Sequence, residues 1–84
     1  MIRLIYFASL RTIAGKDEET LDLDQETTIQ QLGERIRKTT PQIGEMILGK
    51  KIMVAVNQDV AQLDTVVKDG DEIAFLPPFS GGTK

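Results

Sequence analysis

The two most apolar stretches of the chain lie at its opposite ends, with one clearly amphipathic helix between them. Residues 1–8 (MIRLIYFA) predict a strand covered on both faces, at least in part, and residues 73–76 (IAFL) predict the last strand. We expect these two strands to lie side by side at the centre of a sheet. If they run parallel, the chain between them must cross over through the helix, normally in a right-handed sense.

The central helix carries the strongest local signals. Thr28 suits the N-cap position and Gln31 follows three residues later, which is the capping-box pattern. One apolar stripe then recurs at helical spacing: Ile29, Leu32 and Ile36. Pro41 is expected to halt the helix. Gly33 inside it indicates either a close approach to the sheet or simple tolerance of glycine.

The remaining elements are shorter. We expect Ser9 to cap one helical turn that ends at Gly15, with Leu10 and Ile13 facing inward. The other expected elements are a half-exposed strand at 18–23, a loose segment at 42–51, strands at 52–56 and 60–63 around a turn at 57–59, and a turn at 69–70. This order predicts an α+β domain, residues 1–76, with a mixed sheet and one main helix packed on one face: the β-grasp arrangement.

Strand alternation assigns side chains to the two faces of this sheet. Ile2, Leu4 and Tyr6 alternate with Arg3, Ile5 and Phe7, and Ile73 and Phe75 alternate with Ala74 and Leu76. If the first set in each strand packs on the helix, Phe7 and Leu76 lie on the open face, with Val60 nearby. An exposed apolar patch of this kind marks a partner surface, whereas the alternative is that these residues belong to the core or stand singly.

Composition excludes several classes of function. The chain has no Cys and no His, so it has no disulfide, no thiolate metal site and none of the commonest general base. Its net charge of −3 and scattered basic residues argue against nucleic-acid binding. No stretch resembles a signal peptide or a membrane span, so we expect a cytoplasmic protein without a membrane partner. The acidic residues between 17 and 24 predict a solvated edge, and we expect no metal site and no bound cofactor.

The last eight residues, 77–84, differ from the rest. Pro77 and Pro78 cannot donate ladder hydrogen bonds, and their fixed φ favours an extended exit from the sheet. Gly81 and Gly82 lack side chains, so this backbone fits a channel too narrow for other residues. The pattern indicates a globular body that presents a flexible Gly-Gly tail to another protein's active site, although a frayed terminus is the common alternative.

Three stretches, YFASLRTIAGKDE, VAVNQD and DGDEIAFLPPFSGG, together resemble the small subunit of molybdopterin synthase. This is the MoaD-type sulfur carrier of the ubiquitin-like β-grasp class, and the likeness runs from Met1 to Gly82. It implies that an E1-like enzyme uses ATP to adenylate the carboxylate of Gly82, which is then converted to a thiocarboxylate with sulfur from a donor protein. The loaded tail would enter the large subunit and give its sulfur to cyclic pyranopterin monophosphate during molybdenum cofactor biosynthesis.

The same resemblance assigns contacts to the body. It implies that Phe7, Val60, Leu76 and the exit residues Pro77, Pro78 and Phe79 pack against the large subunit and the activating enzyme. Arg11 would pair with an acidic group of a partner. The carrier itself would be non-catalytic, and the complex would be a heterotetramer with two copies of each subunit.

Residues Thr83 and Lys84 depart from the family pattern, because only a terminal carboxylate can be activated. Either a peptidase removes them, or they were added to the natural sequence, or this copy is not a competent carrier. Three other functions stay open: a sulfur carrier for thiamine, cysteine or tRNA thiolation, a ubiquitin-like modifier joined to lysines, and an interaction module with an inert tail.

Overall fold

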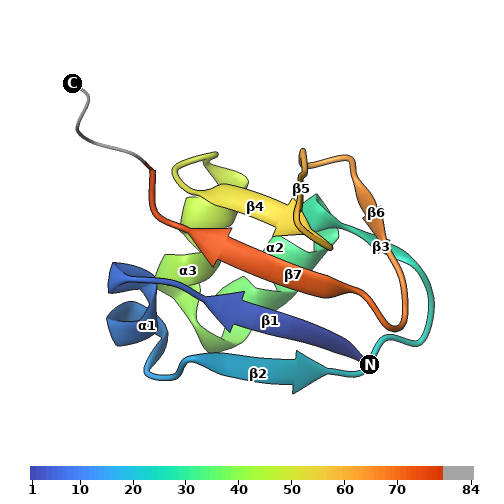
Figure 1. Cartoon of the computed structure of the whole chain (residues 1–84), viewed down its shortest axis with the longest axis horizontal. Coiled ribbons are helices and arrows are strands. Elements are labelled where there is room, and N and C mark those ends of the chain that lie inside the picture. Colours follow the sequence, from blue (N-terminus) through green and yellow to red (C-terminus); the bar gives the residue numbers. More distant parts are fainter. Residues whose placement is uncertain (79–84) are drawn as a thin grey trace.

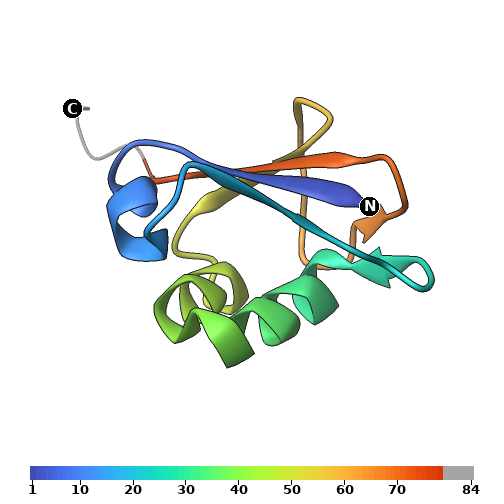
Figure 2. The same cartoon turned by 90° about the horizontal axis from the view of Figure 1, so that it is seen from below.

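The computed structural model of the chain describes residues 1–78. Within these residues, helices cover one face of a mixed sheet whose strand order is β2-β1-β7-β4-β5, and the other face stays open (Figures 1 and 2). The sheet contains β1 (Ile2–Tyr6), β2 (Glu18–Leu21), β4 (Met53–Val56), β5 (Asp59–Val60) and β7 (Glu72–Leu76). A second, two-stranded sheet joins β3 (Thr27–Thr28) to β6 (Val66–Val67). The helices are α1 (Ser9–Ala14), α2 (Ile29–Thr39) and α3 (Pro41–Leu48).

The central pair of strands confirms the expected topology. Strands β1 and β7 run parallel, with Leu4 opposite Ile73 and Tyr6 opposite Phe75. Leu4, Ile73 and Phe75 are fully buried, because the connection between the two strands contains helices that pack on this face of the sheet. The predicted β-grasp fold is therefore confirmed.

Helix α2 begins as its sequence predicts. The Thr28 hydroxyl accepts a hydrogen bond from the Gln31 N–H at 3.1 Å, and the Gln31 side-chain oxygen accepts one from the Thr28 N–H at 3.0 Å. This reciprocal capping box satisfies two donors that the first turn would otherwise leave unpaired. The predicted apolar stripe of α2 is buried against the sheet.

The segment expected to be loose contains helix α3 instead. Pro41 does end α2, but it is also the first residue of α3, a position where its missing N–H costs nothing. The two helices pack very closely: a Cβ added at Gly44 would lie 2.4 Å from the Cα of Arg37. Gly33 serves the same contact, since its added Cβ would lie 3.0 Å from Ile47. The close approach at Gly33 is therefore to α3 and not to the sheet.

Several boundaries also differ from expectation. Ser9 is the first residue of α1 and not its cap; Ala8 occupies the cap position without a side-chain hydrogen bond. Gly15 ends α1 with φ of 80°, as predicted. Strand β2 ends at Leu21, two residues before the expected end. Strand β5 ends at Val60 and not at 63, because the chain then turns toward the helices, where the Leu63 carbonyl accepts a hydrogen bond from the Gln30 N–H. The short strands β3 and β6 were not predicted.

Candidate functional site

The open face of the sheet carries a continuous apolar surface. Two expected members, Phe7 and Val60, are 43% and 67% exposed, and Leu76 is half-buried. We call the whole surface the open-face patch: Ile5, Phe7, Met53, Ala55, Val60, Ala74 and Leu76. The alternation prediction is thus confirmed for β1 and β7, whose alternate side chains are buried on the helix side: Ile2, Leu4, Tyr6, Ile73 and Phe75.

Strand register explains why these side chains are contiguous. Ala74 pairs with Ile5 on one side and Ala55 on the other, and Ala55 also pairs with Val60. Paired side chains in a sheet point to the same face, so these four form one row. The sequence shows the alternation within each strand, but it does not show which strands are neighbours.

The next row lies closer to the end of β7. Met53 pairs with Leu76, and the Phe7 N–H donates to the Phe75 carbonyl at 3.1 Å, which places Phe7 beside Leu76. Met53 is 37% exposed and was missed in the sequence analysis. The predicted strand at 52–56 implies that its side chains alternate between two faces. Only the pairing of Met53 with Leu76 of β7 shows that Met53 lies in the patch.

A charged row closes the patch at its far end. Arg3 pairs in register with Glu72, and its guanidinium lies 3.2 Å from carboxylate oxygens of both Glu18 and Glu72. These exposed ion pairs contribute little to stability. Their effect is to limit the apolar surface to the part of the sheet nearest the tail.

The tail leaves the body directly beside this patch. Strand β7 ends at Leu76, as the two prolines predicted, and Pro77 and Pro78 follow at the end of the sheet that also carries α1 (Figure 1). Pro77 is half-buried and Pro78 is exposed. The remaining expected residues, Phe79, Gly81 and Gly82, lie outside the described residues.

Arg11 lies at the same end of the molecule, on α1. Its side chain is exposed and donates from Nε to the Ala8 carbonyl at 3.5 Å, and it forms no ion pair within residues 1–78. Ala8 itself has φ of 52°, which is uncommon for a residue with a side chain. Pairing of Arg11 with an acidic partner group stays a prediction.

A rigid aromatic layer supports the patch from below. The rings of Tyr6 and Phe75 stack with their centroids 5.5 Å apart, and the Tyr6 hydroxyl donates to Glu19 at 2.6 Å. Burial raises the pKa of Tyr6 well above its usual value, and the hydrogen bond to Glu19 and its negative charge raise it further. Tyr6 therefore stays neutral and has a structural role in the buried layer.

The opposite end of the sheet is fastened by a buried carboxylate. Asp71 accepts hydrogen bonds from the Lys68 N–H at 2.9 Å and from the Asn57 amide at 3.0 Å. The backbone bond from Lys68 lowers the pKa of Asp71, and the Asn57 amide lowers it further. Asp71 joins two turns far from the tail, so its ionised state stabilises the body.

The acidic residues of the described part of the chain do not gather into a metal site. Within residues 1–78, no group of three or more Asp or Glu residues is placed to hold a metal ion. The acidic edge is used structurally instead, with Glu18 paired to Arg3 and Glu19 bound to Tyr6 and Lys16. No helix in this same range has the length and apolarity needed to span a bilayer. The feature that stands out is an exposed apolar face next to the point where Pro77 and Pro78 leave the sheet.

Comparisons of sequence and of structure find similar proteins of the same kind. The model of the ThiS family matches residues 4–82. A molybdopterin synthase sulfur carrier subunit from Haemophilus influenzae is 38% identical over 86 residues, covering 98% of this chain and 100% of the relative.

Solved structures extend the likeness. A putative molybdopterin converting factor subunit 1 from Pyrococcus furiosus superposes with a TM-score of 0.79 at 30% identity, covering 93% of this chain and 97% of that one. The small archaeal modifier protein 1 from Methanosarcina acetivorans has a TM-score of 0.77 at 27% identity, covering 96% and 95%. The predicted resemblance to the molybdopterin synthase carriers is confirmed, and the chain belongs to the ThiS family.

Proposed function

We propose that this chain is the sulfur-carrier small subunit of a molybdopterin synthase. The observation that carries the proposal is the full-length match to a relative of that description, 38% identical from end to end. The structure supports it with an apolar face that adjoins the point where the chain leaves the sheet. A partner that covers this face would receive the tail at the same time.

The reacting group in this proposal is the carboxylate of Gly82, with Gly81 before it. A carboxylate is a poor acceptor for a sulfur nucleophile, so an E1-like enzyme uses ATP to form an acyl adenylate at Gly82. Sulfur supplied by a donor protein at the oxidation level of sulfide then displaces AMP and leaves a thiocarboxylate. This sulfur passes to cyclic pyranopterin monophosphate inside the large subunit. Thr83 and Lys84 must be absent for the carboxylate to exist.

The body contributes binding and not catalysis. The absence of Cys and His from the chain agrees with this role, because adenylation and sulfur transfer are carried out by the partners. Phe7, Val60 and Leu76 bind the large subunit and the activating enzyme in turn, and Pro77 and Pro78 direct the tail away from the sheet. Arg11 pairs with an acidic group on either partner.

Two forms of the chain test the proposal, one ending at Gly82 and one retaining Thr83 and Lys84. Each is incubated with ATP, a sulfur donor and the activating enzyme, and intact mass spectrometry detects the exchange of oxygen for sulfur. We expect a thiocarboxylate only on the form ending at Gly82, and molybdopterin only when the large subunit and its substrate are added. Equal sulfur donation by the longer form would contradict the proposed reacting group.

A second candidate function is a protein modifier. It is favoured by the structural likeness to the small archaeal modifier protein of Methanosarcina acetivorans. A modifier would form isopeptide bonds between Gly82 and lysines of other proteins. Mass spectrometry of cell extracts distinguishes the two, since a carrier that only donates sulfur leaves no such adducts.

A further inference from the structure

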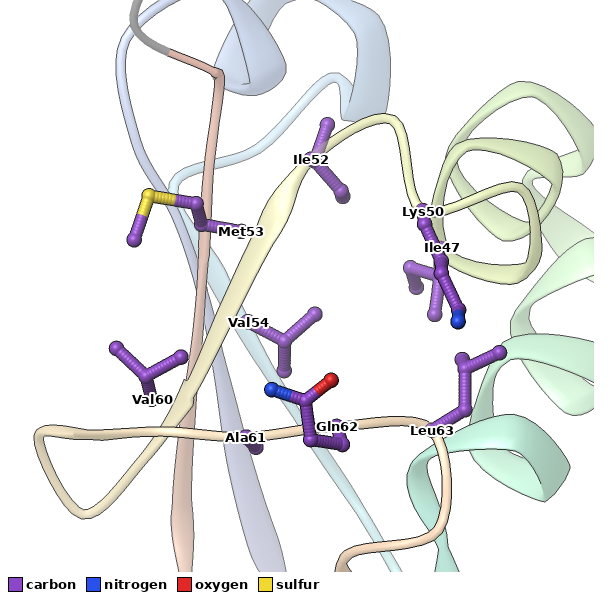
Figure 3. A pocket seen from close by; sticks show the side chains of 9 residues that line it. All are labelled: Ile47, Lys50, Ile52, Met53, Val54, Val60, Ala61, Gln62 and Leu63. Carbon is purple, nitrogen blue, oxygen red and sulfur yellow. The ribbon is translucent and has the colours of Figure 1, made fainter.

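A groove runs along the outer edge of β4, where the sheet meets the helices. It encloses about 190 Å³ between the end of α3, the start of β4 and the chain that follows β5. Its lining is mostly apolar: Ile47, Ile52, Met53, Val54, Val60, Ala61 and Leu63, with Lys50 and Gln62 at the rim (Figure 3). No residue of the proposed sulfur transfer except Val60 belongs to it.

The backbone at this edge has an unused pair of hydrogen-bonding groups. The Val54 carbonyl accepts from the Ala61 N–H at 2.8 Å, so Val54 directs its backbone toward the outer edge. Ile52, two residues earlier, lies at the bend that leads into β4 on this side of the groove. Within residues 1–78, neither group of Ile52 has a backbone partner. Such an edge can pair with an added strand.

Lys50 is held at the rim in an unfavourable conformation. It follows α3 with φ of 58°, a position where glycine is usual because a side chain is strained there. Its nitrogen faces Leu63 across the groove (Figure 3). Lys50 is the one charged residue of the lining and forms no ion pair within residues 1–78. Strain retained at a lysine over an apolar groove indicates a binding role.

The groove is continuous with the open-face patch. Met53 and Val60 belong to both, and Figure 3 shows them on one side of β4 while Ile52 and Val54 lie on the other. A protein that covers the patch can therefore reach around the edge of β4 without a break in the contact. The unpaired backbone suits an extended segment, the apolar lining suits an apolar side chain, and Lys50 suits a carboxylate next to that side chain.

We propose that this groove binds an extended, acidic and apolar segment of the large synthase subunit. The segment pairs its backbone with Ile52, places an apolar side chain against the partly accessible Ala61 and Leu63, and pairs its carboxylate with Lys50. This inference rests on the proposed function, because it assumes that the large subunit covers the open-face patch.

The test measures the affinity of the full chain for the large subunit by calorimetry, with two charge reversals one residue apart. Lys50→Glu places a carboxylate in the groove, whereas Lys51→Glu makes the same change over α3, where Lys51 lies beside Gln42 and Glu45. We expect Lys50→Glu to weaken binding roughly tenfold and Lys51→Glu to change it less than about twofold. Equal effects of the two variants would overturn the proposal.

A third variant separates binding from folding. Lys50→Gly removes the strained side chain, so we expect Tm to rise by roughly 2–6 °C while binding weakens. Hydrogen exchange should show slower exchange of the Ile52 amide in the complex than in the free chain. Unchanged exchange of the Ile52 amide, or full affinity of Lys50→Gly for the large subunit, would also contradict binding in the groove. Failure of the unaltered chain to bind the large subunit at all would instead contradict the proposed function, and this inference with it.

Discussion

The two faces of the sheet are built from the same strands but do different work. On the covered face, Leu4, Ile73 and Phe75 are fully buried beneath α2 and α3. On the open face, their immediate neighbours Ile5, Ala74 and Leu76 remain accessible. Alternation along a strand therefore separates two properties in one-residue steps.

This separation has a physical consequence for how the molecule tolerates change. Burial of apolar area on the covered face supplies most of the free energy of folding in a small domain, which has little core to spare. The open-face patch exposes apolar area at little cost to stability, and in the proposed function a partner covers it. Substitutions on the covered face should therefore change folding, and substitutions on the open face should change binding.

The largest expected effect comes from the same truncation on the two faces. Phe75→Ala should lower the free energy of unfolding by about 3–5 kcal/mol, because it removes a fully buried ring that stacks on Tyr6. Phe7→Ala, at a ring that is 43% exposed, should cost less than about 1 kcal/mol. Urea unfolding of both variants measures the difference. Equal losses would mean that Phe7 is part of the core and that the two faces are not distinct.

A charge on the open face tests the other half of the comparison. Val60→Asp should weaken binding to the large subunit roughly 30-fold, about 2 kcal/mol, because the carboxylate would be buried without a partner. Val66→Asp is the matched control, since Val66 is 53% exposed on β6 outside the patch. Calorimetry should show little change for this control, and both variants should unfold at nearly the same urea concentration as the unaltered chain. If both variants weakened binding equally, the open-face patch would not be the binding surface.

The smallest effect concerns the one polar atom of the aromatic layer. Tyr6→Phe keeps the stack on Phe75 and removes the hydrogen bond to Glu19, so it should cost about 1–2 kcal/mol near neutral pH. Because the pKa of Tyr6 is raised in the folded chain, the neutral phenol stabilises the fold below about pH 10, and this stabilisation is lost at higher pH.

Unfolding measured across the alkaline range checks this dependence. The difference between the unaltered chain and Tyr6→Phe should shrink above about pH 10. Tyr6 is the only tyrosine in the sequence, so absorbance reports its ionisation directly. Tyrosinate that forms at the usual pH in the folded chain would show that the phenol is not buried as described.

Local signals in the sequence were sufficient for much of the fold and for part of the site. The capping box at Thr28 and Gln31, the glycine end of α1 and the two prolines after β7 each act through neighbouring backbone, so spacing alone reveals them. Alternation likewise identified Phe7 and Leu76 as members of the open face. Pro41 ends α2 as predicted, but helix α3 in the segment expected to be loose was missed, because the same proline is also the first residue of that helix.

Which side chains face inward, and where the chain leaves the sheet, could be predicted from the sequence, because both depend on residues only a few positions apart. Which side chains lie together on one surface depends on the tertiary structure. Met53 lies beside Leu76 through strand pairing, Gly44 permits the close contact of α2 with α3, and Lys50 and Leu63 line the same groove. The residues in each of these arrangements are far apart in the sequence and share no periodic pattern, so only packing in three dimensions brings them together.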